Sequence, residues 1–156
     1  MRILFWLSVI ISGVVTVSGF VLTNLSTASI DPGGNNYTGG NGNVGLMFIV
    51  FPSLIVMYFF FAMMFVLEMV HERISITRRT LQIGYVSVFL FIVGISLYRI
   101  ISFRNEAQQY VDYELGYLSP FSNHLFFNVW TFIACLCAAG FFSFYLKKSG
   151  PRGGEK

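Results

Sequence analysis

Few residues of this chain are of types that do chemistry, and two of them lie in the segment EMVHE. Glu68 and His71 are three residues apart, a spacing that places two metal ligands on one face of a helix. Carboxylate metal sites in helix bundles use this spacing twice and add glutamates from other helices, whereas here it occurs once. We therefore expect Glu68 and Glu72 to belong to the solvated end of a helix, and we assign no metal or other cofactor to the chain.

Two cysteines, Cys135 and Cys137, raise the question of thiol redox chemistry. Residues two apart on a helix lie about 200° apart around its axis, so the two sulfurs would point to opposite faces. Thiols in apolar surroundings also ionise poorly and therefore react slowly. We expect both cysteines to serve as small packing residues.

The segment 103–124 carries the other polar and aromatic side chains that bear on function. Its acids and its histidine could meet at a cation or a basic partner, although scattered carboxylates in a polar segment are usually solvated; these residues are Glu106, Asp112, Glu114 and His124. At helical spacing, four aromatic residues share one face, which is typical of a helix at a membrane surface or against a partner; they are Tyr110, Tyr113, Tyr117 and Phe121. We predict that this aromatic face is an interface.

Motifs of the major enzyme classes are missing from the sequence. It contains no nucleophile motif, no phosphate-binding glycine loop and no dinucleotide fingerprint. We therefore predict a protein without enzymatic activity. An enzyme acting at the outer surface through the 103–124 segment is kept as a lesser alternative.

Composition predicts the elements that hold these residues. Hydrophobic residues make up 55% of the 156-residue chain and charged residues only 11%, against about 25% charged residues in soluble domains. A helix needs about 20 apolar residues to cross a membrane, and four blocks have that length: 3–23, 46–67, 81–102 and 125–146. Because bare backbone in lipid leaves polar groups unpaired, these blocks must be helices. We predict an all-α fold, a bundle of four transmembrane helices in a single domain 1–146, followed by a basic tail 147–156.

Lysine and arginine positions predict the orientation of the four spans. If the spans alternate, most cations fall on one side of the membrane: Arg2, Arg73, Arg78, Arg79, Lys147, Lys148, Arg152 and Lys156. The positive-inside rule then makes both termini cytoplasmic and places the connectors 24–45 and 103–124 outside. The net charge of +3 thus reflects topology rather than nucleic-acid binding. Arg99, near the outer boundary, is either a side chain that extends to the surface or a contact for an anion or a partner.

The first block has an alternative interpretation. Arg2 and the small residues of LSTAS could belong to a cleaved signal peptide, but the apolar run is longer than the roughly 7 to 15 residues of a signal core. We expect the span to be retained. The connector 24–45 is rich in glycine and asparagine, which predicts a flexible loop.

Small residues predict helix packing, since helices in lipid approach closely where side chains are small. The first block carries such a stripe, formed by Ser8, Ser12, Thr16 and Gly19, and the third and fourth blocks carry comparable residues, namely Gly84, Ser87, Gly94, Thr131, Ala134 and Ala138. We predict that the first, third and fourth spans pack together. The second span, with its bulky MYFFFAMMF run, would lie at the periphery or against a partner. We also predict a hydrogen bond between the Tyr58 and Ser12 hydroxyls, and either a helix start or a kink at Pro52.

These observations favour a small multi-pass protein of a bacterial plasma membrane. Its predicted partners are the lipid bilayer and either another membrane protein or further copies of itself, with no nucleic acid. The leading hypothesis is an accessory or regulatory subunit that acts by contact. The alternative is a component of an oligomeric transporter or channel, which would require a polar or hydrated cavity at the middle of the membrane.

Overall fold

The computed structural model describes residues 2–28, 43–110 and 121–146, and the elements within these ranges are all helical. Four segments are long and apolar enough to cross a membrane: Arg2–Leu25, Ser53–His71, Arg78–Ala107 and Asn123–Ser143. The prediction of an all-helical chain with four spans is confirmed. The protein therefore has the architecture of a multi-pass membrane protein.

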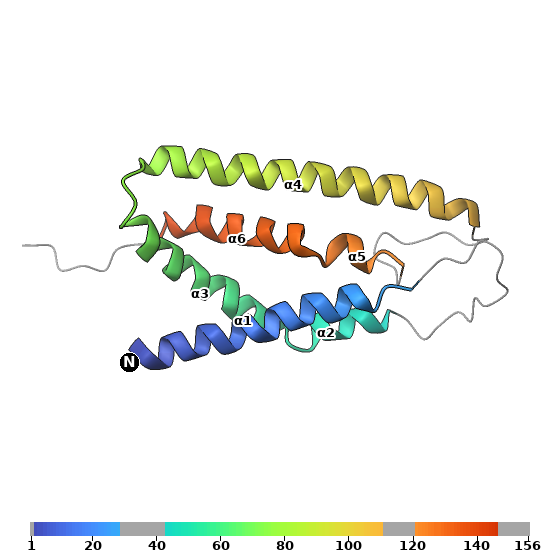
Figure 1. Cartoon of the computed structure of the whole chain (residues 1–156), viewed down its shortest axis with the longest axis horizontal. Coiled ribbons are helices and arrows are strands. Elements are labelled where there is room, and N and C mark those ends of the chain that lie inside the picture. Colours follow the sequence, from blue (N-terminus) through green and yellow to red (C-terminus); the bar gives the residue numbers. More distant parts are fainter. Residues whose placement is uncertain (1, 29–42, 111–120, 147–156) are drawn as a thin grey trace, which may run out of the picture.

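The four long helices lie side by side in the order α1, α3, α6, α4 (Figure 1). The central pair is formed by α3 (Ser53–His71) and α6 (Val129–Ser143), with α1 (Arg2–Leu25) packed on α3 and α4 (Arg78–Ala107) packed on α6. The end of the bundle where α1 and α4 begin is called proximal, and the end where they finish is called distal.

The position of the second span corrects the predicted packing order. It was expected at the periphery, but α3 lies between α1 and α6, while α1 and α4 are on opposite sides of the central pair (Figure 1). Its aromatic side chains explain the difference. Phe59 is buried and stacks on Phe132 of α6 with ring centroids 6.1 Å apart, and Gly13 of α1 leaves room for the same ring. Bulky residues here fill the space between three helices, and aromatic pairs of this kind contribute about 0.5–1.5 kcal/mol beyond their buried area.

Two of the spans are interrupted near the distal end. The second consists of the 3₁₀ turn η1 (Val44–Leu46), the short helix α2 (Met47–Val50) and then α3, which begins directly after Pro52. The fourth consists of the short helix α5 (Asn123–Phe126), two non-helical residues and then α6. The chain is thus two hairpins of similar design, α1 with α2 and α3, and α4 with α5 and α6. A second 3₁₀ turn, η2 (Gln108–Tyr110), follows α4.

Helix length places the second interruption inside the membrane. At 1.5 Å per residue, the 15 residues of α6 span only about 22 Å, less than the roughly 30 Å of a hydrocarbon core. Together, α5 and α6 provide the missing length. Backbone groups released between them therefore need partners within the protein.

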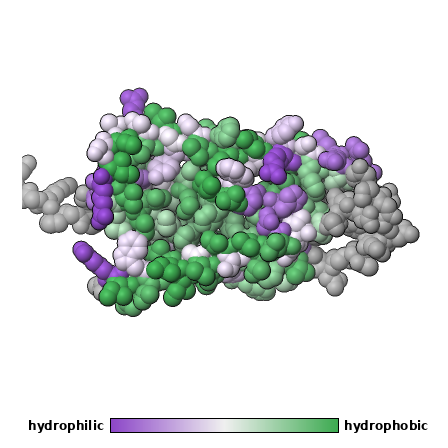
Figure 2. All heavy atoms as spheres, viewed as in Figure 1, coloured by the Kyte–Doolittle hydropathy of each residue, from purple (hydrophilic) through white to green (hydrophobic). Residues whose placement is uncertain are grey.

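Charge and hydropathy divide the molecule into a middle and two ends. In the view of Figure 2, apolar side chains cover the middle, and hydrophilic ones gather toward the two ends. Arg2 and Arg78 are the first residues of α1 and α4 and so mark the proximal end, whereas Arg104 lies in the last turn of α4 at the distal end. This distribution is that of a chain threaded through an apolar layer.

The backbone of α1 approaches the second span closely at Gly19. A Cβ atom added there would lie 2.7 Å from the carbonyl oxygen of Phe48. That carbonyl is four residues before Pro52, which has no N–H to donate to it. Glycine therefore lets the helix backbone of α1 cover the point where the helical hydrogen-bond ladder is broken.

We expect the substitution Gly19→Ala to lower the free energy of unfolding by about 1–3 kcal/mol, because the added methyl group must push the Phe48 backbone away. The matched control is Gly94→Ala on α4, where an added Cβ meets nothing within 4 Å. Thermal unfolding of the full chain in mild detergent, followed by circular dichroism, measures both. Equal melting temperatures for the two variants would contradict the close approach.

Candidate functional site

The side chain of Asn128 forms four hydrogen bonds at the interruption between α5 and α6. Its amide nitrogen donates to the carbonyl oxygens of His124 and Leu125, each at 2.9 Å. Its amide oxygen accepts from the backbone nitrogens of Trp130 and Thr131 at 2.9 and 3.2 Å. A single amide therefore donates to two carbonyl groups of α5 and caps the first turn of α6. The Thr131 hydroxyl completes the cap by accepting from the backbone nitrogen of Asn128 at 3.1 Å.

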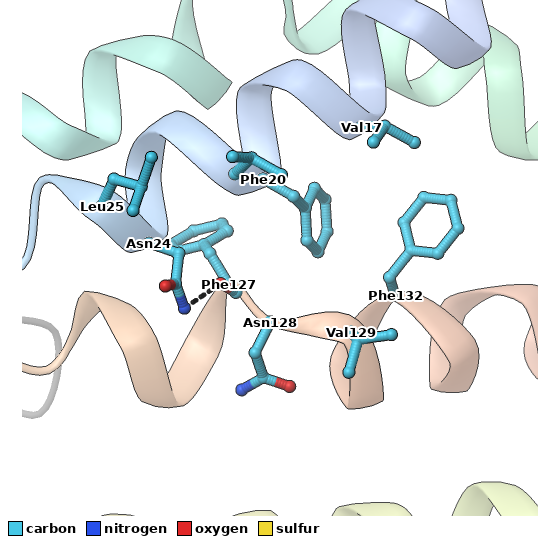
Figure 3. A pocket seen from close by; sticks show the side chains of 9 residues that line it. Val17, Phe20, Asn24, Leu25, Phe127, Asn128, Val129 and Phe132 are labelled. Carbon is cyan, nitrogen blue, oxygen red and sulfur yellow. Dashed lines mark hydrogen bonds between the residues drawn. The ribbon is translucent and has the colours of Figure 1, made fainter.

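A second amide reaches the same interruption from α1. Asn24 donates to the carbonyl oxygen of Phe127 at 2.8 Å (Figure 3). It also donates to the carbonyl oxygen of His124 at 3.5 Å. At the preceding residue, the Thr23 hydroxyl donates to the carbonyl oxygen of Gly45 at 2.9 Å. The last turn of α1 thus supplies donors to both interrupted spans.

The two short helices are themselves joined by a pair of amides. Asn43, next to η1, and Asn123, the first residue of α5, exchange two hydrogen bonds of 2.6 and 2.8 Å. Asn123 has no solvent-exposed surface. Since each amide satisfies both a donor and an acceptor of the other, the pair is a self-sufficient connection between the two hairpins.

Two grooves flank the interruption, and both are lined mainly by apolar side chains. The Asn24 groove, between α1 and the α5–α6 segment, has a volume of about 460 Å³ and is lined by Val17, Phe20, Val21, Asn24, Phe127 and Phe132 among others. The Arg99 groove, between α4 and the same segment, has a volume of about 300 Å³ and is lined by Phe91, Ile92, Ile95, Arg99, Asn128 and Trp130 among others. Figure 3 shows that the Asn128 side chain points away from the first groove. Both volumes are in the range of small-ligand pockets, about 300–1,000 Å³.

A third polar cluster lies at the proximal end around His71. Its Nε2 atom is 2.8 Å from the Tyr85 hydroxyl of α4, and its Nδ1 atom is 3.3 Å from the Ser143 hydroxyl of α6. Because the Ser143 hydroxyl donates to the carbonyl oxygen of Gly140 at 2.7 Å, it accepts from Nδ1, and in the neutral ring Nε2 then accepts from the Tyr85 hydroxyl. The ring also stacks on Phe144 with centroids 4.5 Å apart. His71 therefore joins α3, α4 and α6 through both of its ring nitrogens.

The sequence analysis placed Glu68 and His71 in a possible metal pair and did not link His71 to Tyr85. Within the described residues, no group of three or more histidine, cysteine, aspartate or glutamate side chains gathers as a metal site would require. One carboxylate oxygen of Glu68 is buried without a hydrogen-bond partner. Cys135 is exposed and Cys137 is buried, so the two thiols face different surroundings.

The predicted stripe on α1 is largely enclosed. Ser12, Thr16 and Gly19 are buried, and the two hydroxyls donate to carbonyl oxygens of their own helix, Val9 at 3.1 Å and Ser12 at 2.7 Å. Polar side chains in this stripe are therefore satisfied locally, which leaves their small size as the property used in packing.

The predicted hydrogen bond between Tyr58 and Ser12 is wrong by one helical turn. The Tyr58 hydroxyl lies 2.6 Å from the hydroxyl of Ser8, which itself donates to the carbonyl oxygen of Phe5. Tyr58 is therefore the donor. The prediction counted depth along a straight second span, whereas α3 begins after Pro52 and crosses α1 at an angle (Figure 1).

The predicted outer interface is only partly within the described residues. Tyr113 and Tyr117 lie outside them, and Tyr110 ends the turn η2. Phe121 is described and is only 7% exposed. Arg99 is exposed and lines the second groove.

Sequence reasoning missed the interruption at Asn128 although a signal was present. Asn128 followed three residues later by Thr131 is a helix-start pattern, which the structure forms as a capping box. It was hidden because the apolar block 125–146 has the length of an uninterrupted span. Comparison of the chain with protein-family models, curated proteins and solved structures finds no match.

Removal of the Tyr85 hydroxyl tests the proximal cluster. We expect Tyr85→Phe to lower the free energy of unfolding by about 1 kcal/mol, because Nε2 of His71 loses its donor in a partly buried place. The control is Tyr98→Phe on the same helix, where the side chain is 73% exposed. Chemical denaturation in detergent measures both variants. A loss of similar size in the control would show that the effect is not due to His71.

A double-mutant cycle tests the amide pair. Asn43→Leu and Asn123→Leu each leave one amide without its partner, so each is expected to lower stability by about 1–3 kcal/mol. The double variant is expected to lose clearly less than the sum of the two, because no unpaired amide remains. Strictly additive losses, measured by the same unfolding assay, would refute a direct interaction.

Proposed function

We propose that the protein is a non-enzymatic accessory or regulatory subunit that acts by contact with another membrane protein. The contact surface is the side of α4 that faces away from α6. The chain needs no catalytic site for this role. In the described residues, the amides of Asn24, Asn123 and Asn128 and the ring of His71 are all engaged in joining helices.

The observation that carries the proposal is a stripe of small residues on the outward face of α4. Gly84, Ser87 and Gly94 are all exposed, and an added Cβ at either glycine would meet nothing within 4 Å. These residues were predicted to pack inside the bundle, and that prediction is wrong. The packed face of α4 instead includes Ile92 and Ile100.

Small residues on a lipid-facing surface require a physical reason. Glycine destabilises a helix by about 1 kcal/mol relative to alanine, and lipid chains gain nothing from a notch in the surface. A second helix does gain, because small residues let two backbones approach and increase van der Waals contact. The open surface at Gly94 therefore fits a transmembrane helix of a partner protein.

We further propose that the proximal end, with Arg2, Arg73 and Arg78, faces the cytoplasm of a bacterial cell. The support is the excess of arginine in the short proximal segments, which is typical of cytoplasmic loops. In this orientation the interruptions in the second and fourth spans lie near the outer surface of the membrane. The partner helix would then contact α4 along the cytoplasmic half of the membrane as well as its middle, because Gly84 and Ser87 lie near the proximal end of α4 and Gly94 lies near its centre.

Affinity purification from native membranes in mild detergent tests the contact. We expect the tagged chain to recover a defined membrane protein, and we expect Gly94→Leu to reduce this recovery about tenfold, equivalent to about 1.4 kcal/mol. The control is Val86→Phe, which adds similar bulk at an exposed position of α4 outside the stripe. This variant is expected to keep the partner.

Two outcomes would refute the proposal. The first is recovery of the chain alone from native membranes under conditions that preserve other membrane complexes. The second is recovery of a second, differently tagged copy of this chain through the same face, which would make the stripe a homo-oligomer contact.

A further inference from the structure

The Arg99 groove combines a cation with an apolar channel. Arg99 lies at its distal end, and Ile95 and Phe91 follow on the same side of α4 toward the proximal end. The eight helical steps from Arg99 to Phe91 span about 12 Å, close to the roughly 15 Å of hydrocarbon in one leaflet. The charged end of the groove is therefore near the membrane surface, and the apolar end is near the middle of the membrane.

The charge of Arg99 is not compensated by the helices that surround the groove. The segments α5 and α6 contain no acidic residue, and the single acid of α4, Glu106, follows seven residues later, about 10 Å along the axis. The titratable side chain facing Arg99 from α5 is His124, which adds no negative charge. The positive end of the α6 dipole also points toward this region, since Trp130 in the first turn of α6 lines the groove.

Size determines which class of ligand fits. A helix 12 Å long and about 11 Å across occupies about 1,100 Å³, well above the volume of about 300 Å³ in the groove. At about 30 Å³ for a methylene group, similar to a water molecule, the groove holds about ten carbons of one chain. An alkyl chain fits where a helix does not.

We propose that the Arg99 groove binds one anionic phospholipid of the distal leaflet. Its phosphate contacts the Arg99 guanidinium, whose planar donors match phosphate oxygens in pairs. One acyl chain follows Ile95 and Phe91 toward the centre of the bilayer. The headgroup lies at the membrane surface, so the polarity of the lipid matches that of the groove.

Lipid retention by the purified full-length chain tests this site. The detergent-solubilised protein is mixed with phosphatidylglycerol or phosphatidylcholine, exchanged into fresh detergent and examined by native mass spectrometry. We expect one phosphatidylglycerol to be retained per chain, in preference to phosphatidylcholine. Arg99→Gln is expected to reduce this retention about fivefold or more, since a cation near anionic lipid contributes about 1 kcal/mol and a direct contact adds to it. The control Arg104→Gln removes the same charge from the same end of α4 outside the groove and is expected to change retention less than twofold.

A second pair of variants tests the acyl-chain part of the groove. Ile95→Trp fills the groove and is expected to abolish retention, whereas Leu97→Trp, at an exposed position of α4 outside the groove, is expected to preserve it. Melting temperatures of all variants show whether they remain folded. If Ile95→Trp unfolds, the comparison of Arg99→Gln with Arg104→Gln still tests whether the groove binds the lipid.

Several results would overturn the proposal. Equal losses in Arg99→Gln and Arg104→Gln would indicate general attraction to charge, and equal retention of the two lipids would remove the role of Arg99. Full displacement of phosphatidylglycerol by millimolar inorganic phosphate would show a soluble-anion site instead. Retention of a free fatty acid in place of a phospholipid would likewise exclude the headgroup contact.

Discussion

Backbone hydrogen bonding in hydrocarbon is the constraint on which this fold depends. An intact helix satisfies it alone, but the second and fourth spans are interrupted near the distal end, where water cannot be relied on to pair the released groups. The structure meets this requirement with amides. Asn128 closes both sides of one interruption, and Asn24 reaches the same place from α1. At the other interruption, Gly19 brings the backbone of α1 onto the carbonyl that Pro52 leaves without its helical donor.

The same constraint gives the polar residues of the described ranges a structural role. The hydroxyls of Ser12 and Thr16 donate to carbonyls of their own helix, amides pair at the distal end, and His71 joins three helices at the proximal end. Surfaces left for interaction are then of two kinds. The outward side of α4 is notched and nearly uncharged, which suits a helix, whereas the Arg99 groove is narrow and carries a cation, which suits a lipid.

Much of the fold could be predicted from the sequence because lipid imposes simple rules. Block length and low charge were sufficient to place four helices, and small residues marked the buried stripe Ser12, Thr16 and Gly19. The order of the helices was not predictable in this way, because an apolar side chain such as that of Phe59 is as compatible with a lipid-facing position as with a buried one. The contacts of Tyr58 and Asn128 were missed for a related reason: both depend on interruptions that shift the helices by about a turn, and hydropathy does not report such shifts.

The pairing of Asn43 with Asn123 has a consequence for how the protein is made. The two residues are 80 positions apart, so the first hairpin is synthesised and enters the membrane long before its amide partner exists. At about 5–20 residues per second, this interval is about 4–16 seconds. During that time Asn43 must keep contact with water or with the insertion machinery, and it can leave this environment only when the second hairpin arrives. Biogenesis of the chain therefore ends, rather than begins, with the closing of its distal end.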